Sequence, residues 1–260
     1  MTSSIVVAGA PGSGKTTLVA HLARILELPV RLPMDGATAS QAVDAARFAS
    51  LGVAMAGRDA GKAIVETCAY GASWQGEAGI VIVVIDALSA AAGFSDTALS
   101  AIAQADLIAL SRTDLVDPAS ARDSVAAVAQ CSIVDVVHGK LPPELLPTSQ
   151  LRPICLAGWQ KAETWSYAGA ARLEPALAES FLQRRPRGVT RIKGRALSGK
   201  AGLVLDQSGR ARSVSPCEPP AETLLFAAGK HGAFHENDMA VHFAETASTA
   251  SASAGWFGFR

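Results

Sequence analysis

The residues best able to do chemistry lie near the N-terminus, in the run Gly9-Ala-Pro-Gly-Ser-Gly-Lys-Thr-Thr17. Gly9, Gly14, Lys15 and Thr16 match G-x-x-x-x-G-K-[S/T], the pattern of a phosphate-binding loop. Glycines let such a loop turn its N–H groups toward phosphate oxygens at the positive end of a helix. We expect Lys15 to reach the β and γ phosphates and the Thr16 hydroxyl to coordinate Mg²⁺. The candidate nucleotide-binding residues of this loop are Gly9, Gly12, Ser13, Gly14, Lys15, Thr16 and Thr17.

Two other interpretations of the same run are a plain glycine turn and a dinucleotide-binding fingerprint, since Gly9-x-x-Gly12-x-Gly14 loosely matches one. The dipeptide Lys15-Thr16 favours the phosphate-binding loop, because the fingerprint has no lysine followed by a hydroxyl residue.

Three acidic residues could hold the metal or orient an attacking water. Glu66 stands where a short apolar strand is expected to end, and we expect it to hold Mg²⁺ through a water molecule. Asp86 ends the apolar run 79–86 and competes for this role, and Asp35 follows the short run 30–32. Carboxylates near phosphate commonly serve a metal, so the sequence leaves the choice among the three open. Together with Lys15, they are the candidate catalytic residues.

The run Ser111-Arg-Thr-Asp114 follows another apolar strand and matches the guanine-reading N-K-x-D pattern in place and partly in residues. A carboxylate at Asp114 can accept two hydrogen bonds from guanine, whereas adenine lacks the amino group and leaves it unpaired. We expect Arg112 to lie over the base where lysine is usual, and Ser111 to replace the amide. GTP is therefore favoured over ATP as the ligand.

These motifs need elements that position them. Strands expected at 5–8, 30–32, 63–66, 79–86, 107–110 and 133–137 alternate with helices expected at 18–26, 40–56, 96–105 and 118–130. This alternation predicts an α/β fold of the P-loop NTPase class with a mostly parallel sheet. Strand-like runs separated by Gly and Pro turns then predict a small α+β C-terminal domain, closed by a helix at 236–246.

The domain boundaries follow from this change of pattern. We expect a P-loop domain over residues 1–150, a linker region over 151–187 and the small domain over 188–260, with a small-residue tail at 247–255 that lacks order.

Composition excludes several classes of protein. The 260 residues contain 23 basic and 23 acidic side chains, so no net charge draws the chain to nucleic acid or anionic membranes. No run of about 18 apolar residues and no basic leader is present, which predicts a cytoplasmic protein without a membrane span. The four cysteines form no C-x-x-C pair, which favours reduced thiols over disulfides or a structural zinc site.

The order and spacing of these motifs resemble the CobW group of P-loop GTPases, relatives of the UreG and HypB metal-insertion GTPases. The resemblance extends from the phosphate loop through Glu66-Thr67, Val83–Ala87 and Ala105–Val116. It continues in Arg191–Gly194 and Glu222–Phe226, which are similar to the small CobW C-terminal domain. The resemblance implies GTP binding, slow hydrolysis, and a conformational change passed to a client protein or a homodimer partner in metal or cobalamin-related cofactor delivery.

The chain also departs from that group. The metal-binding C-x-C-C motif, expected between the second and third strands, is absent, because residues 33–62 contain no cysteine. Ala69 stands where the group has the glycine of E-x-x-G. The remaining candidates for Zn²⁺ or Co²⁺ are Cys68, for which a packed thiol is the favoured interpretation, and His231 with His235, for which exposed polar residues are the favoured interpretation. An ATP-dependent small-molecule kinase and a nucleotide-dependent interaction module remain as alternative functions.

Overall fold

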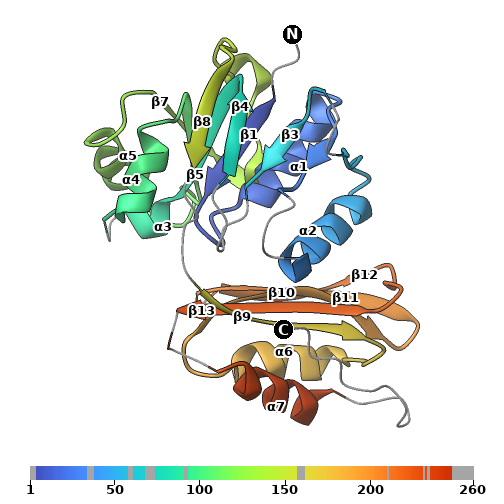
Figure 1. The fold of residues 1–260 in the computed structure, drawn as a ribbon. Helices are drawn as coiled ribbons and strands as arrows, with labels where there is room; N and C mark the ends of the chain where they lie inside the picture. The colour runs from blue at the N-terminus through green and yellow to red at the C-terminus, as the bar shows by residue number, and fades with distance from the viewer. Residues whose placement is uncertain are drawn as a thin grey trace. The chain divides into compact units, whose positions relative to one another are not determined.

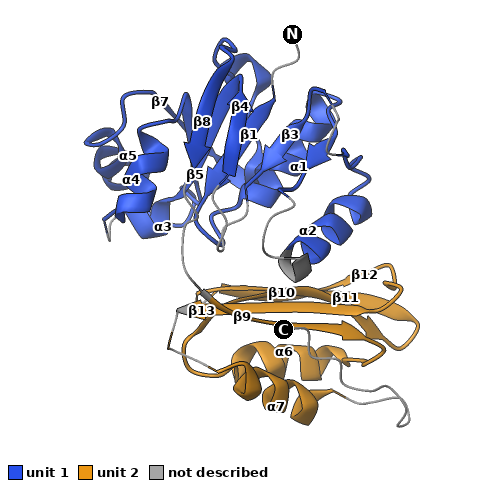
Figure 2. Cartoon of the chain, viewed as in Figure 1, with its two compact units in different colours: residues 1–160 blue, residues 161–260 orange. Residues whose placement is uncertain are grey.

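A computed structural model describes residues 4–33, 38–57, 61–67, 74–90, 93–156, 162–209, 211–230, 232 and 235–247. The chain forms two compact units, Met1–Gln160 and Lys161–Arg260 (Figure 2). Among the helices of these residues, none has the length and apolar content needed to cross a membrane.

The first unit is built on a six-stranded sheet of order β2-β3-β1-β5-β6-β7 (Figure 1). Every neighbouring pair in this sheet is parallel. The strands are β1 (Ile5–Gly9), β2 (Val30–Arg31), β3 (Ile64–Glu66), β5 (Ile80–Asp86), β6 (Leu107–Ser111) and β7 (Ser132–Val136). The predicted α/β class with a mostly parallel sheet is confirmed.

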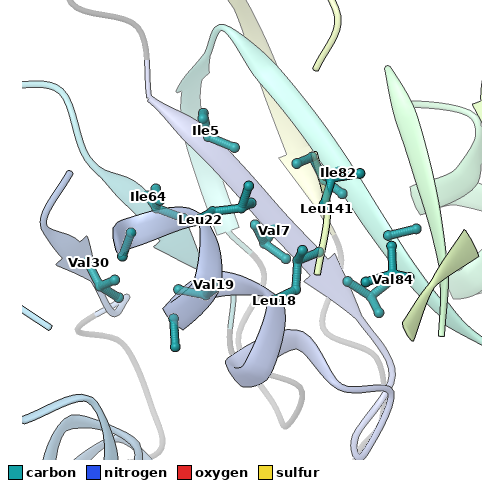
Figure 3. Close-up of a cluster of buried hydrophobic side chains, with 14 of the residues drawn as sticks. Ile5, Val7, Leu18, Val19, Leu22, Val30, Ile64, Ile82, Val84 and Leu141 are labelled. Atoms are coloured by element: carbon teal, nitrogen blue, oxygen red, sulfur yellow. The ribbon is translucent and has the colours of Figure 1, made fainter. Parts of the chain in front are cut away.

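Helices cover both faces of this sheet, which explains why its central strands β1, β5 and β6 are apolar over nearly their whole length. They are α1 (Lys15–Ile25), α2 (Thr38–Ser50), α3 (Ala87–Ala90), α4 (Asp96–Ile102) and α5 (Pro118–Ala126). On one face, Val7 of β1 packs in a buried cluster with Leu18 and Leu22 of α1 (Figure 3). On the other face, Val6 belongs to a second cluster that includes Val125 of α5. Alternate residues of β1 therefore serve two separate cores.

Local signals fix the ends of these helices. Ser95 caps α4 by accepting a hydrogen bond from the Ala98 N–H, and Asp117 caps α5 by accepting one from the Ala119 N–H. Pro118 occupies the first turn of α5, where its missing N–H costs nothing. The Asp117 carboxylate therefore caps a helix, and Asp114 is the acidic residue that stands in the turn before it.

A two-stranded antiparallel ribbon of β4 (Trp74–Ala78) and β8 (Arg152–Leu156) completes the first unit, with the 3₁₀ turns η1 (Val137–Gly139) and η2 (Pro143–Leu145). The sequence did not predict this ribbon. The range 151–187, expected as a linker, holds β8, β9 and α6.

The second unit is a five-stranded sheet of order β12-β11-β10-β13-β9, antiparallel throughout. Its strands are β9 (Ala162–Gly169), β10 (Val189–Ser198), β11 (Ala201–Ser208), β12 (Ala211–Cys217) and β13 (Thr223–Lys230). Helices α6 (Pro175–Gln183) and α7 (Glu236–Thr246) lie on one face of this sheet (Figure 1). Phe181 and Phe243 join them to Ile192 and Leu225 in one buried core. The expected antiparallel α+β unit is confirmed as a fold.

Candidate nucleotide-binding site

The phosphate loop connects the carboxyl end of β1 to the first turn of α1. Gly12 and Gly14 have φ values of 77° and 94°, in the left-handed region that favours glycine. A Cβ atom on Gly9 would lie 2.5 Å from the carbonyl oxygen of Val84 on β5. Gly14 caps α1 without a side-chain hydrogen bond, so the N–H groups of this first turn are presented by backbone geometry alone. A helix start of this kind is suited to bind an anion.

Lys15 directs its ammonium group into this loop. The side chain is only 6% exposed. Its Nζ donates hydrogen bonds to the carbonyl oxygens of Gly9 at 2.8 Å and Ala10 at 2.9 Å. The positive charge is therefore held among the peptide groups that the motif assigns to phosphate.

Thr16 and Glu66 are joined although they are fifty residues apart in the sequence. The Thr16 hydroxyl donates a hydrogen bond of 2.8 Å to Oε1 of Glu66, and Glu66 is 5% exposed. Glu66 ends β3, which pairs in parallel with β1 and places Glu66 opposite Val7. A hydroxyl and a carboxylate are oxygen ligands of the kind that Mg²⁺ takes. The oxygen atoms that Thr16 and Glu66 bring together are therefore of the chemical type that Mg²⁺ takes.

Asp86 has different partners. Its Oδ1 accepts from the Leu88 N–H at 3.1 Å, and its Oδ2 lies 3.2 Å from the Ser89 hydroxyl and 2.9 Å from Nη2 of Arg112. Asp86 thus starts α3 and pairs with an arginine, whereas Glu66 contacts Thr16. Asp35, the third candidate acid, lies outside the described residues.

The run from Ser111 to Asp114 leaves the end of β6 beside the loop. The buried Ser111 hydroxyl lies 2.7 Å from the carbonyl oxygen of Ser13 and 3.2 Å from that of Ile85. Arg112, at a φ of 56°, directs its guanidinium to the Gly12 carbonyl oxygen and to Asp86. This differs from the expectation that Arg112 lies over a base. Asp86 ends the neighbouring strand β5 opposite Ser111, and its carboxylate holds the guanidinium there. Asp114 is exposed.

A further loop, not expected from the motifs, packs on the first turn of α1. After β7, His138 and Gly139 have φ values of 52° and 73°. A Cβ atom on Gly139 would lie 2.6 Å from Cγ2 and 2.9 Å from the carbonyl carbon of Thr17. The signal in the sequence was a glycine directly after a strand, next to a histidine. This loop therefore lies directly against Thr17, in the first turn of α1.

The transition-metal candidates do not form a cluster in the described part of the chain. Cys68 and His231 lie outside the described residues. His235 stands just before α7, where its N–H donates to Oδ2 of Asp238 at 3.2 Å. His242 is engaged by Phe181, whose carbonyl oxygen accepts from Nε2 at 2.8 Å. Among the described residues, no group of three or more His, Cys, Asp or Glu side chains is arranged to hold a metal ion.

The loop, the helix it opens and the parallel strand order define the class of the first unit, a P-loop nucleotide-binding α/β fold. No protein-family model matches the chain, and no curated protein matches it significantly.

The solved structures that are similar to it include the following three. The Zn(II)-bound YjiA GTPase from E. coli shares 14% identity over 94% of this chain and 98% of its own, with a TM-score of 0.36. HypB from Helicobacter pylori in complex with nickel shares 15% sequence identity over 54% of this chain and 80% of its own, with a TM-score of 0.37. The signal recognition particle receptor FtsY from Elizabethkingia anophelis in complex with GDP shares 18% sequence identity over 57% of this chain and 60% of its own, with a TM-score of 0.36. At such identities and TM-scores the likeness concerns the fold alone and carries no conclusion about activity.

Proposed function

We propose that this protein binds GTP together with Mg²⁺ and hydrolyses it slowly. The observation that carries the proposal is the hydrogen bond of 2.8 Å between Thr16 and Glu66, directly beside the buried Lys15. It brings a metal-binding hydroxyl and a carboxylate to the helix start where a phosphate would lie.

Each residue has a distinct role in this proposal. The N–H groups of the loop and the Lys15 ammonium bind the phosphates, and Thr16 and Glu66 hold Mg²⁺, which offsets charge that develops on the transferred phosphoryl group. The exposed Asp114 accepts hydrogen bonds from the guanine edge. Arg112 is held by Asp86, so we expect a low intrinsic rate that a client protein or a second copy of the chain raises.

The test of the guanine assignment is a titration of the purified protein with labelled GTP and labelled ATP in the presence of Mg²⁺. We expect GTP to bind at least about tenfold more tightly, because adenine leaves the Asp114 carboxylate unpaired. Equal affinities, or a preference for ATP, would overturn the GTP assignment and support the ATP-dependent kinase instead.

The variant Asp114→Asn sharpens this test. An amide can donate to a base that carries a carbonyl where guanine carries its amino group, so the variant should lose GTP affinity and gain affinity for xanthosine triphosphate. Asp117→Asn is the control, because Asp117 caps α5 through the Ala119 N–H. If Asp114→Asn retained the full preference for GTP, another residue would have to read the base.

Delivery of Zn²⁺ or Co²⁺ to a client protein is the further role that the resemblance implies, and it belongs to the same proposal. Phosphate release measured with and without each metal tests whether a metal is linked to turnover. Metal stoichiometry that is unchanged in His231→Ala and His235→Ala would exclude these histidines as ligands. An absence of turnover under every metal condition would leave a nucleotide-dependent interaction module.

A further inference from the structure

Asp86 and Arg112 form an ion pair where two neighbouring strands end. Asp86 is the last residue of β5, and its register partner on β6 is Ser111, the residue before Arg112. Oδ2 of Asp86 lies 2.9 Å from Nη2 of Arg112, and the two side chains are 12% and 25% exposed. The Leu88 N–H and the Ser89 hydroxyl also donate to this carboxylate. Three donors from two elements thus hold Asp86 in one orientation.

The other contact of Arg112 is with the phosphate loop. The same Nη2 donates to the carbonyl oxygen of Gly12, and the adjacent Ser111 hydroxyl contacts the carbonyl oxygen of Ser13. Ser111, the last residue of β6, and Arg112, which follows it, therefore contact two consecutive carbonyl groups of the loop. Because a trans peptide points its C=O and N–H to opposite sides, holding the Ser13 oxygen turns the Gly14 N–H away from Ser111. Holding the Gly12 oxygen fixes the Ser13 N–H, which donates to the carbonyl oxygen of Ala10 at 3.2 Å and so closes a turn within the loop.

We infer that Asp86 is a positioning residue for the phosphate loop. It acts through Arg112, whose guanidinium holds the Gly12 carbonyl and thereby fixes the turn that leads into the phosphate-binding N–H groups at the start of α1. Asp86 contacts neither Mg²⁺ nor the attacking water in this assignment, which removes it from the three acids that competed for the metal. The inference rests on the proposed nucleotide binding and goes beyond it, since it identifies the residues that fix the conformation of the phosphate loop.

The assignment predicts that the ion pair affects the affinity for the phosphates, but neither the preference for guanine nor the dependence of binding on Mg²⁺. Loss of the pair should weaken binding of the phosphates, whereas base choice depends on Asp114, which the pair does not include. A residue that held Mg²⁺ would matter only when Mg²⁺ is present. A residue that shapes the loop should matter equally when the metal is chelated.

The test is to measure the GDP dissociation constant, with Mg²⁺ and with a chelator, for Asp86→Asn, Arg112→Gln and the double variant. We expect each single variant to bind GDP about tenfold more weakly, the effect of one charge-assisted hydrogen bond. The loss should be the same with and without Mg²⁺, and the GTP-to-ATP affinity ratio should not change. The double variant should bind GDP as tightly as the single variant with the lower affinity, because both single substitutions break the same interaction.

Two further variants distinguish a change in the phosphate loop from a general loss of folding. Arg112→Lys keeps a positive charge and should recover part of the GDP affinity. Asp135→Asn is the matched control, since it breaks the Arg122–Asp135 pair of 2.8 Å on β7 of the same sheet and should leave GDP binding unchanged. Thermal unfolding of each variant reports its stability.

Several results would overturn the inference. Native-like GDP affinity in Asp86→Asn would do so, as would single effects that add in the double variant. A loss of GDP affinity that disappears when Mg²⁺ is chelated would mean that Asp86 acts on the metal and not on the loop. If the native protein bound ADP in place of GDP, the guanine assignment would fail and the same measurements with ADP would decide the role of Asp86. If it bound neither, the proposed function and this inference would fail together.

Discussion

At the scale of single residues, Glu66 is the acid that contacts the Thr16 hydroxyl. It ends a strand next to β1, so its carboxylate meets Thr16 at the first turn of α1. The geometry assigns the two carboxylates of neighbouring strand ends to different partners, with Glu66 on Thr16 and Asp86 on Arg112. Each assignment can be tested by a change that removes charge and keeps size.

Glu66→Gln should weaken the Mg²⁺-dependent part of nucleotide binding. An amide keeps the volume of the carboxylate but loses its charge, and changes at groups that orient a metal cost about 10- to 100-fold in affinity or activity. GTP hydrolysis should fall by this factor, while GDP binding in a chelator should change little. Glu77→Gln on the exposed side of β4 is the control. An equal loss with and without Mg²⁺ would contradict the metal role.

Cys131 should be an unreactive thiol. Burial, and to a smaller extent the carboxylate of Asp106, raises the pKa of this thiol. A raised pKa leaves less thiolate at a given pH, and the thiolate is the form that reacts with alkylating agents. We expect iodoacetamide to label Cys131 several-fold more slowly than the exposed Cys155, measured by peptide mass spectrometry. The Cys131 rate should keep rising into the alkaline range, and labelling as fast as that of Cys155 at neutral pH would refute this.

At the scale of elements, the loop after β7 and helix α1 meet without room for a side chain. Gly139→Ala would place a Cβ atom 2.6 Å from Cγ2 of Thr17 at a φ of 73°. We expect a loss of about 1–3 kcal/mol in the free energy of unfolding, together with weaker nucleotide binding, because Thr17 follows the phosphate-binding residues.

Gly52→Ala separates the close contact from the backbone strain. Gly52 has a φ of 69°, and a Cβ atom added there would have nothing within 4 Å, so only the cost of the left-handed conformation applies. That cost is about 1 kcal/mol, and nucleotide binding should not change. Equal effects of the two substitutions, measured by denaturant unfolding, would mean that the contact with Thr17 contributes nothing.

The parallel sheet was predictable because its central strands β1, β5 and β6 are nearly continuous apolar runs, and β5 and β6 end at the polar residues Asp86 and Ser111. The ribbon of β4 and β8 was not, since β4 mixes Trp74 with Gly76 and Glu77 and is largely exposed. In β9, Trp165 and Tyr167 do alternate with polar residues, but the prolines before it favoured a linker.

The candidate site was predictable to a similar extent. Lys15, Thr16 and their loop carry a signature in consecutive residues, which a single sequence reveals. The pairing of Asp86 with Arg112 joins two strand ends, and an aspartate at a strand end suits a metal equally well. The register of β5 and β6 brings the two residues together, and the contact of 2.9 Å between their side chains distinguishes the two roles.

At the scale of the whole molecule, the buried clusters divide between the two units. The first two clusters contain residues between Ile5 and Leu156, and the third contains residues between Trp165 and Phe243. A ligand that binds the native first unit at about 100 times its dissociation constant should stabilise it by about 2.7 kcal/mol. The proposed site belongs entirely to this unit.

We therefore expect Gly194→Ala and nucleotide to act on different units. A Cβ atom on Gly194 would lie 2.2 Å from the carbonyl oxygen of Leu224, a backbone atom that cannot yield easily. Hydrogen exchange should show faster exchange in β10 and β13 of the variant, and slower exchange in β1 and α1 when GDP is added. Faster exchange of β1 in the variant, at a level equal to that of β10, would contradict this division.

The phosphate loop is held almost entirely through its main chain. Lys15 binds the carbonyl oxygens of residues 9 and 10, while Arg112 and Ser111 contact those of residues 12 and 13. Every residue type carries that oxygen, so these contacts do not depend on which side chains the loop bears. Substitutions at Ala10 and Pro11 that keep the backbone conformation should therefore leave the contacts from Arg112 and Ser111 in place.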